Sequence, residues 1–272
     1  MESLLIGYLV YPKKTSWLDN RTGGTMGFIK NVFTVFDYLV NPSEYKDKGA
    51  TGERFTFREL KSHFPKKYIL RNVYLKKKDG KLTEIDLLLV TRAGIFVFES
   101  KNYSGWIFGN DKDSQWTQTF PNGAKTKFFS PIIQNKVHVD GLRHNLTEFP
   151  QMRYFSIIVF SDRCELKSIS VDSIEDVYVI KRQNLIWTIK DIQSSHEDVI
   201  NDSEKDKIIE MLSSASRPSD EVKKQHLNEL EDVATQCPRC GRQLVERVNA
   251  KTNDVFYGCK GFPKCRYSAK TL

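Results

Sequence analysis

The chain has 272 residues, with 42 Lys and Arg against 34 Asp and Glu, and 39% of its residues are hydrophobic. This composition is typical of a folded globular protein, and it excludes disordered and fibrous classes. The length allows one large domain, or one medium domain with a small appendage. The net charge of +8 favours an anionic partner, although solubility alone would also explain it.

The chain contains no apolar run of the roughly 18 to 20 residues needed to cross a bilayer. Residues 26–40 come closest, but Lys30, Asn31 and Asp37 interrupt them. The first residues lack the basic region and the small-residue cleavage site of a secretory signal. The sequence therefore predicts a cytoplasmic protein without a membrane span.

The beginning of the chain predicts a tail and then two helices. Residues 1–25 show no convincing period, whereas apolar residues recur at helical spacing over 26–40. We expect this amphipathic helix to pack in the core rather than to dock on a membrane or a partner. A second helix is expected from near Thr51 until Pro65 stops the pattern.

The middle of the chain predicts a mixed sheet with flanking helices. Strand signals cover residues 68–75, 84–90, 94–99, 105–109 and 115–120. A helix at residues 132–146 and a doubly buried strand at 154–160 follow. Weaker strands are expected at residues 166–171 and 177–180, and helices at 182–192 and 204–212. Strands and helices that alternate in this way indicate the α/β class.

Composition shifts divide the chain into four segments. We predict a tail with the amphipathic helix at residues 1–48, and the α/β domain at residues 49–212. A linker with a charged helical spacer is expected at residues 213–236. A small cysteine-containing module follows at residues 237–272.

The densest chemical signal is a set of carboxylates beside a lysine. Side chains alternate along a strand, so Glu99 and Lys101 share one face while Ser100 points away. A tight turn on Arg92-Ala93 would place Asp86 opposite Glu99. A three-residue turn would shift the register by one and separate the two acids. Periodicity leaves both registers open.

Facing carboxylates form a hard-oxygen site suited to magnesium or manganese, and such an ion can bind a scissile phosphate and activate water. A neighbouring lysine can hold the phosphate or orient the water. The alternative is a surface hairpin in which Glu99 and Lys101 form a solvated ion pair of little energetic value.

Motifs spread over residues 49–147 carry a resemblance that extends beyond this tripeptide. They are Gly52-Glu53, residues 84–90, residues 94–105, Gln115-Trp116 and residues 130–135. Together they resemble the nuclease-related domain (NERD) family of the PD-(D/E)xK superfamily. The resemblance implies a restriction-endonuclease-like mixed sheet flanked by helices. The chain departs from the family pattern at Ser130, where Asn is usual before the proline.

The resemblance also implies roles for individual residues. Asp86 and Glu99 would be ligands of a catalytic magnesium or manganese ion, and Glu53 would complete the site. Lys101 would be the catalytic lysine, and Gln134 would reach in from the later helix.

Two further residue pairs are ambiguous from sequence. Gln134 and His138 lie one helical turn apart, so they either face the substrate together or form a solvent-facing polar stripe. We assign a site role to Gln134 but not to His138. Trp106 and Trp116 are expected to pack in the core rather than to stack on bases.

The last 36 residues contain Cys237, Cys240, Cys259 and Cys265. Two short-range cysteine pairs suit a structural tetrahedral zinc site, and disulfides are disfavoured in the cytosol. The module resembles the zinc ribbon of bacterial type I DNA topoisomerases, whose ribbons contact single-stranded DNA. Eight basic residues and two acidic ones occupy this segment. Phosphate and base contacts are expected from Arg239, Arg242, Arg247, Lys260, Lys264, Arg266, Phe256 and Tyr257.

The sequence therefore predicts a magnesium- or manganese-dependent nuclease that hydrolyses DNA and recruits it, in single-stranded form, through a basic zinc ribbon. Three alternatives stay open. The chain could be a non-catalytic nucleic-acid-binding or assembly protein with the nuclease fold, its substrate could be RNA, or the ribbon could dock to a protein.

Overall fold

The computed structural model describes residues 42–216, 219–237, 239–249 and 253–269. The predicted tail at residues 1–25 and the amphipathic helix at 26–40 lie outside these residues, whereas residues 42–48, predicted to belong to the same segment, form the start of a helix at Pro42–His63 that was expected only from near Thr51. The chain divides into two compact units, of which the first includes Lys48–Pro218 and the second includes Ser219–Leu272. Among the described helices, none is long and apolar enough to cross a membrane.

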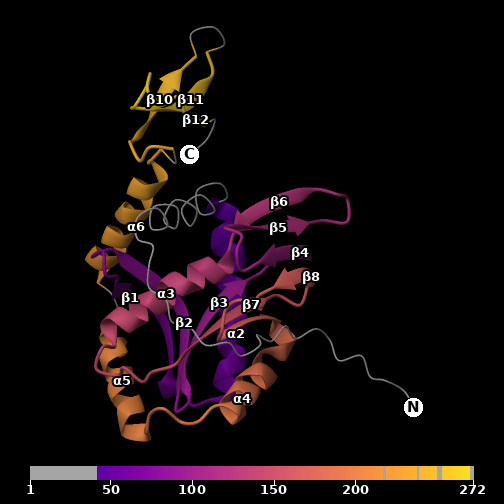
Figure 1. Ribbon diagram of the computed structural model, residues 1–272, viewed down its shortest axis with the longest axis vertical. Helices are drawn as coiled ribbons and strands as arrows, with labels where there is room; N and C mark the ends of the chain where they lie inside the picture. Colours follow the sequence, from indigo (N-terminus) through magenta and orange to yellow (C-terminus); the bar gives the residue numbers. More distant parts are fainter. Residues whose placement is uncertain (1–41, 217–218, 238, 250–252, 270–272) are drawn as a thin grey trace. The chain divides into compact units, whose positions relative to one another are not determined.

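A five-stranded mixed sheet forms the centre of the first unit (Figure 1). Its strands, in spatial order, are β1 (Ile69–Lys76), β2 (Leu82–Thr91), β3 (Gly94–Lys101), β7 (Tyr154–Phe160) and β9 (Val177–Lys181). The first three strands pair antiparallel, whereas β3, β7 and β9 are parallel. The predicted mixed sheet is therefore confirmed.

Helices cover both faces of this sheet because its strands are apolar on both sides. On one face, α3 (Pro131–Asn145) and α5 (Asp202–Ala215) pack against a cluster that includes Val97. On the other face, α2 (Pro42–His63) and α4 (Leu185–Ser195) pack around Phe96 and Phe98. Short 3₁₀ turns at Lys66–Tyr68 and Arg182–Asn184 lead into β1 and α4.

A second, four-stranded sheet shares a hydrophobic cluster with Ile132 of α3 and Phe160 of β7. Its strands, in spatial order, are β6 (Lys125–Phe129), β5 (Gln115–Thr119), β4 (Gly105–Asn110) and β8 (Cys164–Ser170). Trp116 is fully buried and stacks on Phe160 at 6.0 Å, as expected for a core residue. A Cβ at Gly109 would lie 2.1 Å from the Trp116 ring, so glycine is needed beneath the indole. Strand β6, whose Lys-Thr-Lys start is exposed, was not predicted from the sequence.

The β2–β3 hairpin turns on Arg92-Ala93. Thr91 pairs with Gly94, and the same register continues to Leu87 and Phe98. The tighter of the two predicted registers is therefore correct. The ladder ends one pair before Asp86 and Glu99, while β3 continues to pair with β7 as far as Lys101.

The β1–β2 ladder is also interrupted at Asp86. Register pairs flank this position on both sides, but the pair between Asn72 and Asp86 is missing, and Asn72 has a φ of +52°. Leu88 and Ile85 contribute to the same core cluster although their numbers differ by three, so β2 changes face between them. Asp86 therefore lies at a local irregularity where β2 separates from β3.

The second unit contains a helix and a small sheet. Helix α6 (Asp220–Ala234) precedes β10 (Leu244–Val248), β11 (Val255–Cys259) and β12 (Ser268–Ala269), which pair antiparallel. The predicted charged helix and ribbon are thus present. Helix α5 extends to Ala215, three residues into the segment expected to be a linker, and Ala215 packs against the same core cluster as Leu212.

Candidate active site and zinc ribbon

Three of the proposed site residues meet where β3 ends beside α3. Lys101 Nζ lies 3.0 Å from Glu99 Oε1 and donates a hydrogen bond to Gln134 Oε1 at 3.0 Å. Glu99 and Lys101 are 2% and 6% exposed, so this ion pair is not the solvated surface pair considered above. The lysine is held by a carboxylate from its own strand and an amide from the helix.

Ser100 points to the opposite face of the sheet, as strand alternation predicts. Its hydroxyl lies 2.9 Å from Thr56 Oγ1 of α2, and Thr56 also donates to Gly52 O at 3.1 Å. A Cβ at Gly52 would lie 3.2 Å from Asn102 Cβ. The absence of a side chain at Gly52 therefore brings the backbone beside Glu53 close to the end of β3.

Asp86 and Glu53 share this acidic environment. Burial raises the pKa of Asp86 well above its ordinary value, and repulsion from Glu99, Glu53 and Glu84 raises it further. Burial also raises the pKa of Glu53, with Glu99 and Glu84 adding to the effect. Nearby carboxylates therefore penalise each other's ionised forms.

Glu99 behaves differently from its acidic neighbours. Burial alone would raise its pKa, but Lys101 and His138 outweigh that effect and lower it. The ionised form is therefore favoured at Glu99 and disfavoured at Asp86 and Glu53.

His138 is buried beside Glu99, so it does not belong to a solvent-facing stripe. Its Nε2 lies 3.6 Å from Glu99 Oε2, and its Nδ1 lies 2.8 Å from Thr83 Oγ1. Thr83 and Glu84 were not among the site residues predicted from the sequence. Alternation along β2, which places Glu84 two residues before Asp86, could have indicated Glu84.

The donor set suits a hard divalent cation. Glu99 Oε2 is buried and has no hydrogen-bond partner among the described residues. Glu99 raises the pKa values of both Asp86 and Glu53, so the three carboxylates lie within electrostatic reach of one another. Carboxylate oxygens are the ligands that magnesium and manganese prefer. The chemistry of these side chains therefore suits such an ion, although among the described residues only the four cysteines of the ribbon already form a compact group of potential metal ligands.

The loop before α3 contains Ser130, the position that departs from the family pattern. Its side chain is fully buried, and its hydroxyl has no hydrogen-bond partner in the described part of the chain. Its backbone N–H donates to Ser114 O at 2.9 Å. Asn135 anchors the same helix by donating to Val97 O and Ser156 Oγ.

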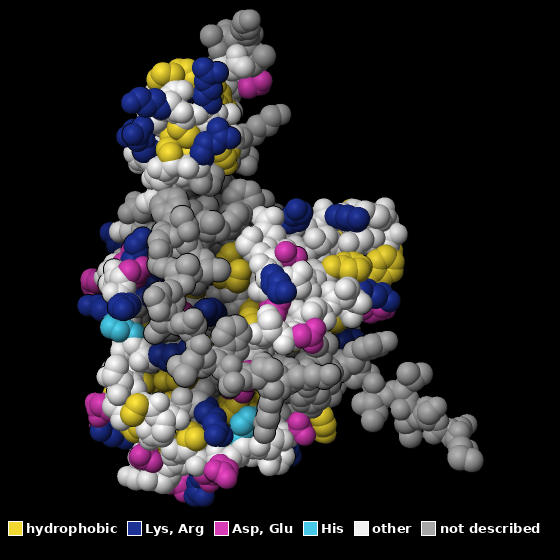
Figure 2. All heavy atoms as spheres, in the orientation of Figure 1, with side chains coloured by type: hydrophobic (Ala, Val, Ile, Leu, Met, Phe, Trp, Pro, Cys, Tyr) yellow, Lys and Arg dark blue, Asp and Glu magenta, His cyan; other side chains and the backbone are white. Residues whose placement is uncertain are grey.

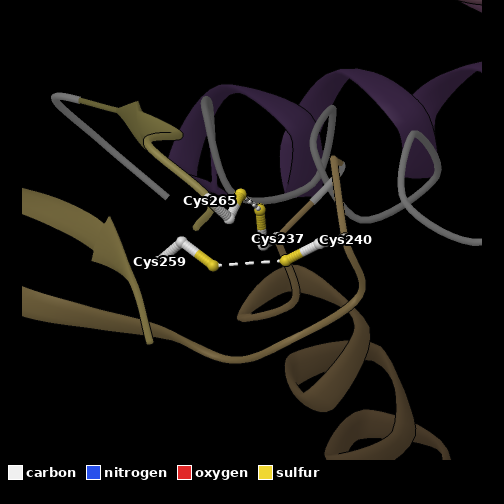
Figure 3. Close-up of side chains that lie close together, drawn as sticks. All are labelled: Cys237, Cys240, Cys259 and Cys265. Carbon is white, nitrogen blue, oxygen red and sulfur yellow. Dashed lines mark hydrogen bonds between the residues drawn. The ribbon is translucent and has the colours of Figure 1, made fainter. Parts of the chain in front are cut away.

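The ribbon contains a compact group of four cysteines (Figure 3). All four sulfurs lie within 4.8 Å of one another. Among the described residues, no other group of three or more His, Cys, Asp or Glu side chains is already arranged so that it could hold a metal ion. Cys240 and Cys259 are 3.3 Å apart, and Cys237 and Cys265 are 3.7 Å apart, too far for disulfides. Zn–S bonds of about 2.3 Å in a tetrahedron place sulfurs about 3.8 Å apart. The cluster therefore supports a structural zinc site.

Lysine and arginine side chains gather on the ribbon around a few apolar ones (Figure 2). In the described part of the ribbon, the exposed bases are Arg239, Arg242, Lys260, Lys264 and Arg266. Phe262 is 58% exposed, more than the partly buried Phe256 and Tyr257 that the sequence favoured for base contacts.

The Arg247 side chain is partly buried and makes contacts within the ribbon. The side chain packs against the backbone of Gly258, where a Cβ would lie 2.8 Å from Arg247 Cδ. Its Nη2 donates to Cys259 O at 3.3 Å, and its guanidinium lies 5.7 Å from the Phe262 ring. Arg247 is therefore less free to meet a phosphate than the five exposed bases.

Comparison with known proteins identifies the first unit. Residues 48–161 match the family model of the nuclease-related domain. An uncharacterised protein of Bacillus anthracis is 34% identical over 157 residues, which cover 57% of this chain and 73% of that protein. The chain belongs to the nuclease-related domain family. The NERD family is a branch of the PD-(D/E)xK superfamily, in agreement with the mixed α/β architecture.

The C-terminal residues of this NERD protein match a second family model. Residues 234–272 match the topoisomerase DNA-binding C4 zinc finger. DNA topoisomerase 1 of Mycoplasma genitalium is 48% identical over 40 residues, and that of Methanothermobacter thermautotrophicus is 46% identical over 41 residues. These matches cover 15% of this chain and only 6% and 5% of the topoisomerases. No solved structure matches the chain.

Proposed function

We propose that this NERD protein is a nuclease that hydrolyses DNA phosphodiester bonds with the help of magnesium or manganese. The observation that carries the proposal is the buried Glu99–Lys101–Gln134 arrangement beside Asp86 and Glu53, inside the matched domain. An ion held by Asp86, Glu99 and Glu53 would supply positive charge to the scissile phosphate and lower the pKa of a bound water.

The residues around that ion have separate roles in this proposal. Lys101 holds a phosphate oxygen or orients the attacking water, and Gln134 fixes the ammonium group for that task. An entering cation would favour the ionised forms of Asp86 and Glu53, whose pKa values are raised by burial first and by repulsion among neighbouring carboxylates second.

The zinc ribbon supplies affinity rather than chemistry in this proposal. Four thiolates fill the coordination shell of zinc and leave no position for water, so the zinc is structural. The five exposed bases and the exposed Phe262 suit contacts with phosphates and unstacked bases of single-stranded DNA. A reducing compartment would keep the four sulfurs as thiolates, and the cytoplasm therefore stays the proposed location.

Cleavage assays on labelled single- and double-stranded DNA and RNA test this function. The full chain should cut DNA in magnesium or manganese and lose activity in a chelator that spares the ribbon zinc. Cleavage restricted to RNA would favour the RNA-directed alternative. Tight binding without cleavage of any substrate would favour the non-catalytic alternative.

A further inference from the structure

We propose that His138 is a positioning residue that holds the Glu99 carboxylate in the orientation needed to ligate the metal. This inference rests on the proposed function, and it assigns a role to a residue outside the ligand set. His138 is 7% exposed, and its Nε2 faces the Glu99 carboxylate.

The two nitrogens of His138 face two different partners. Nδ1 lies 2.8 Å from Thr83 Oγ1, and Nε2 lies 3.6 Å from Glu99 Oε2. The hydrogen bond between Thr83 and Nδ1 fixes the ring so that Nε2 is the nitrogen that faces the carboxylate. Thr83 thereby sets the ring orientation that Glu99 meets.

Each oxygen of Glu99 is approached by a different group. Lys101 Nζ lies 3.0 Å from Oε1, whereas His138 approaches Oε2, the atom that has no hydrogen-bond partner among the described residues. At 3.6 Å the imidazole contact is longer than a hydrogen bond. It restrains rotation of the carboxylate while leaving lone pairs on Oε2 for a metal. Groups behind a metal-binding carboxylate commonly have this function.

Helix α3 is built to bring His138 to this position. One turn further along the helix, a Cβ at Gly141 would lie 2.8 Å from Thr83 Cγ2, so only glycine permits this approach to β2. One turn earlier, Gln134 holds Lys101. A single helix face therefore restrains both members of the Glu99–Lys101 pair.

Manganese binding to the zinc-loaded full chain, measured without nucleic acid by electron paramagnetic resonance, tests the inference. His138→Ala should weaken manganese affinity about 10- to 100-fold, the usual cost of losing such a support. His138→Gln, whose amide can reach the place of Nε2, should recover most of the affinity. His138→Asn reaches only the place of Nδ1 and should not. His144→Ala, at an exposed position of the same helix, is the matched control.

Manganese affinity should decrease in the order wild type, His138→Gln, and then His138→Asn and His138→Ala. Circular dichroism checks that each variant is folded. Equal affinities for the Gln and Asn variants would overturn the inference even if the Ala variant failed to fold. Glu99→Gln separates this failure from failure of the proposed function. Manganese binding that needs Glu99 but is indifferent to His138 refutes the positioning role alone. Binding indifferent to both residues refutes the metal site itself.

Discussion

The ribbon should depend on zinc for its folded state, and Cys259→Ser tests this dependence. Cys259 is almost fully buried, and its sulfur lies 3.3 Å from that of Cys240 and accepts a hydrogen bond from the Gly261 N–H. A serine hydroxyl at this position is a poor zinc ligand and would remain uncharged. The substitution therefore removes one of four ligands with almost no change in volume.

The size of the effect follows from the ribbon's core. Leu244 is the one apolar residue besides cysteines in its buried cluster, as far as the described residues go. Burying one leucine contributes about 1.5 to 3 kcal/mol. Structural zinc contributes apparent binding free energies of about 10 to 16 kcal/mol in small modules. Zinc is thus the dominant stabilising contribution, and the ribbon should unfold when the site is damaged.

Zinc analysis combined with limited proteolysis of the full chain measures this effect. Wild type should contain one zinc per chain and resist cleavage within residues 237–272. Cys259→Ser should lose both properties, while the first unit keeps its thermal transition because its core is separate. Cys164→Ser is the control, since Cys164 is buried in the first unit, where its thiol donates to Ser161 O. A Cys259→Ser chain with full zinc and an intact ribbon would refute the reasoning.

Three other predictions concern the acids, the second sheet and the ribbon. Without divalent metal, Asp86→Asn should raise stability at neutral pH by about 0.5 to 2 kcal/mol. The raised pKa of Asp86 makes its ionised form costly in the folded chain. The wild-type chain therefore loses stability as pH rises through that pKa, and the variant does not. Equal pH profiles from thermal melts of the two chains would contradict this. Gly109→Ala should lower the melting temperature, because overpacking against Trp116 costs about 1 to 3 kcal/mol. Gly123→Asn, at an open turn, should change the melting temperature little. An unchanged melting temperature for Gly109→Ala would show that the indole can move. Deleting residues 237–272 should flatten the salt dependence of DNA binding, since the five bases that are exposed among the described residues would account for about 3.5 to 4.5 of the log–log slope. Turnover at saturating substrate should survive, and an unchanged slope would favour a protein-docking role for the ribbon.

Much of the first unit was predictable because its strands and helices have clear periods. The sequence left two hairpin registers open, and the register with a two-residue turn was found from Leu87 to Thr91. Strand β6 was missed because Lys125-Thr126-Lys127 has no apolar alternation, and it is paired only through its neighbour β5. The change of face near Asp86 was also missed, since it depends on Asn72 in another strand.

The candidate site shows a similar division. Strand alternation was enough to place Glu99 and Lys101 together and Ser100 away from them. The role of His138 could not be assigned, because helical spacing says that it lies near Gln134 but not which strand the helix faces. The close approach at Gly141 decides that orientation, and it becomes visible only when α3 is packed on β2.

The central claim is that Asp86 and its neighbours form a metal-dependent cleavage site. The most direct measurement is the single-turnover rate of DNA cleavage by the full chain and by Asp86→Asn at saturating magnesium. Glu165→Gln, an exposed carboxylate paired with Lys167 on β8, is the matched control. The account predicts that Asp86→Asn loses cleavage by several orders of magnitude, while DNA affinity and the zinc content stay at wild-type levels and Glu165→Gln remains active. Wild-type cleavage by a folded Asp86→Asn chain would contradict it.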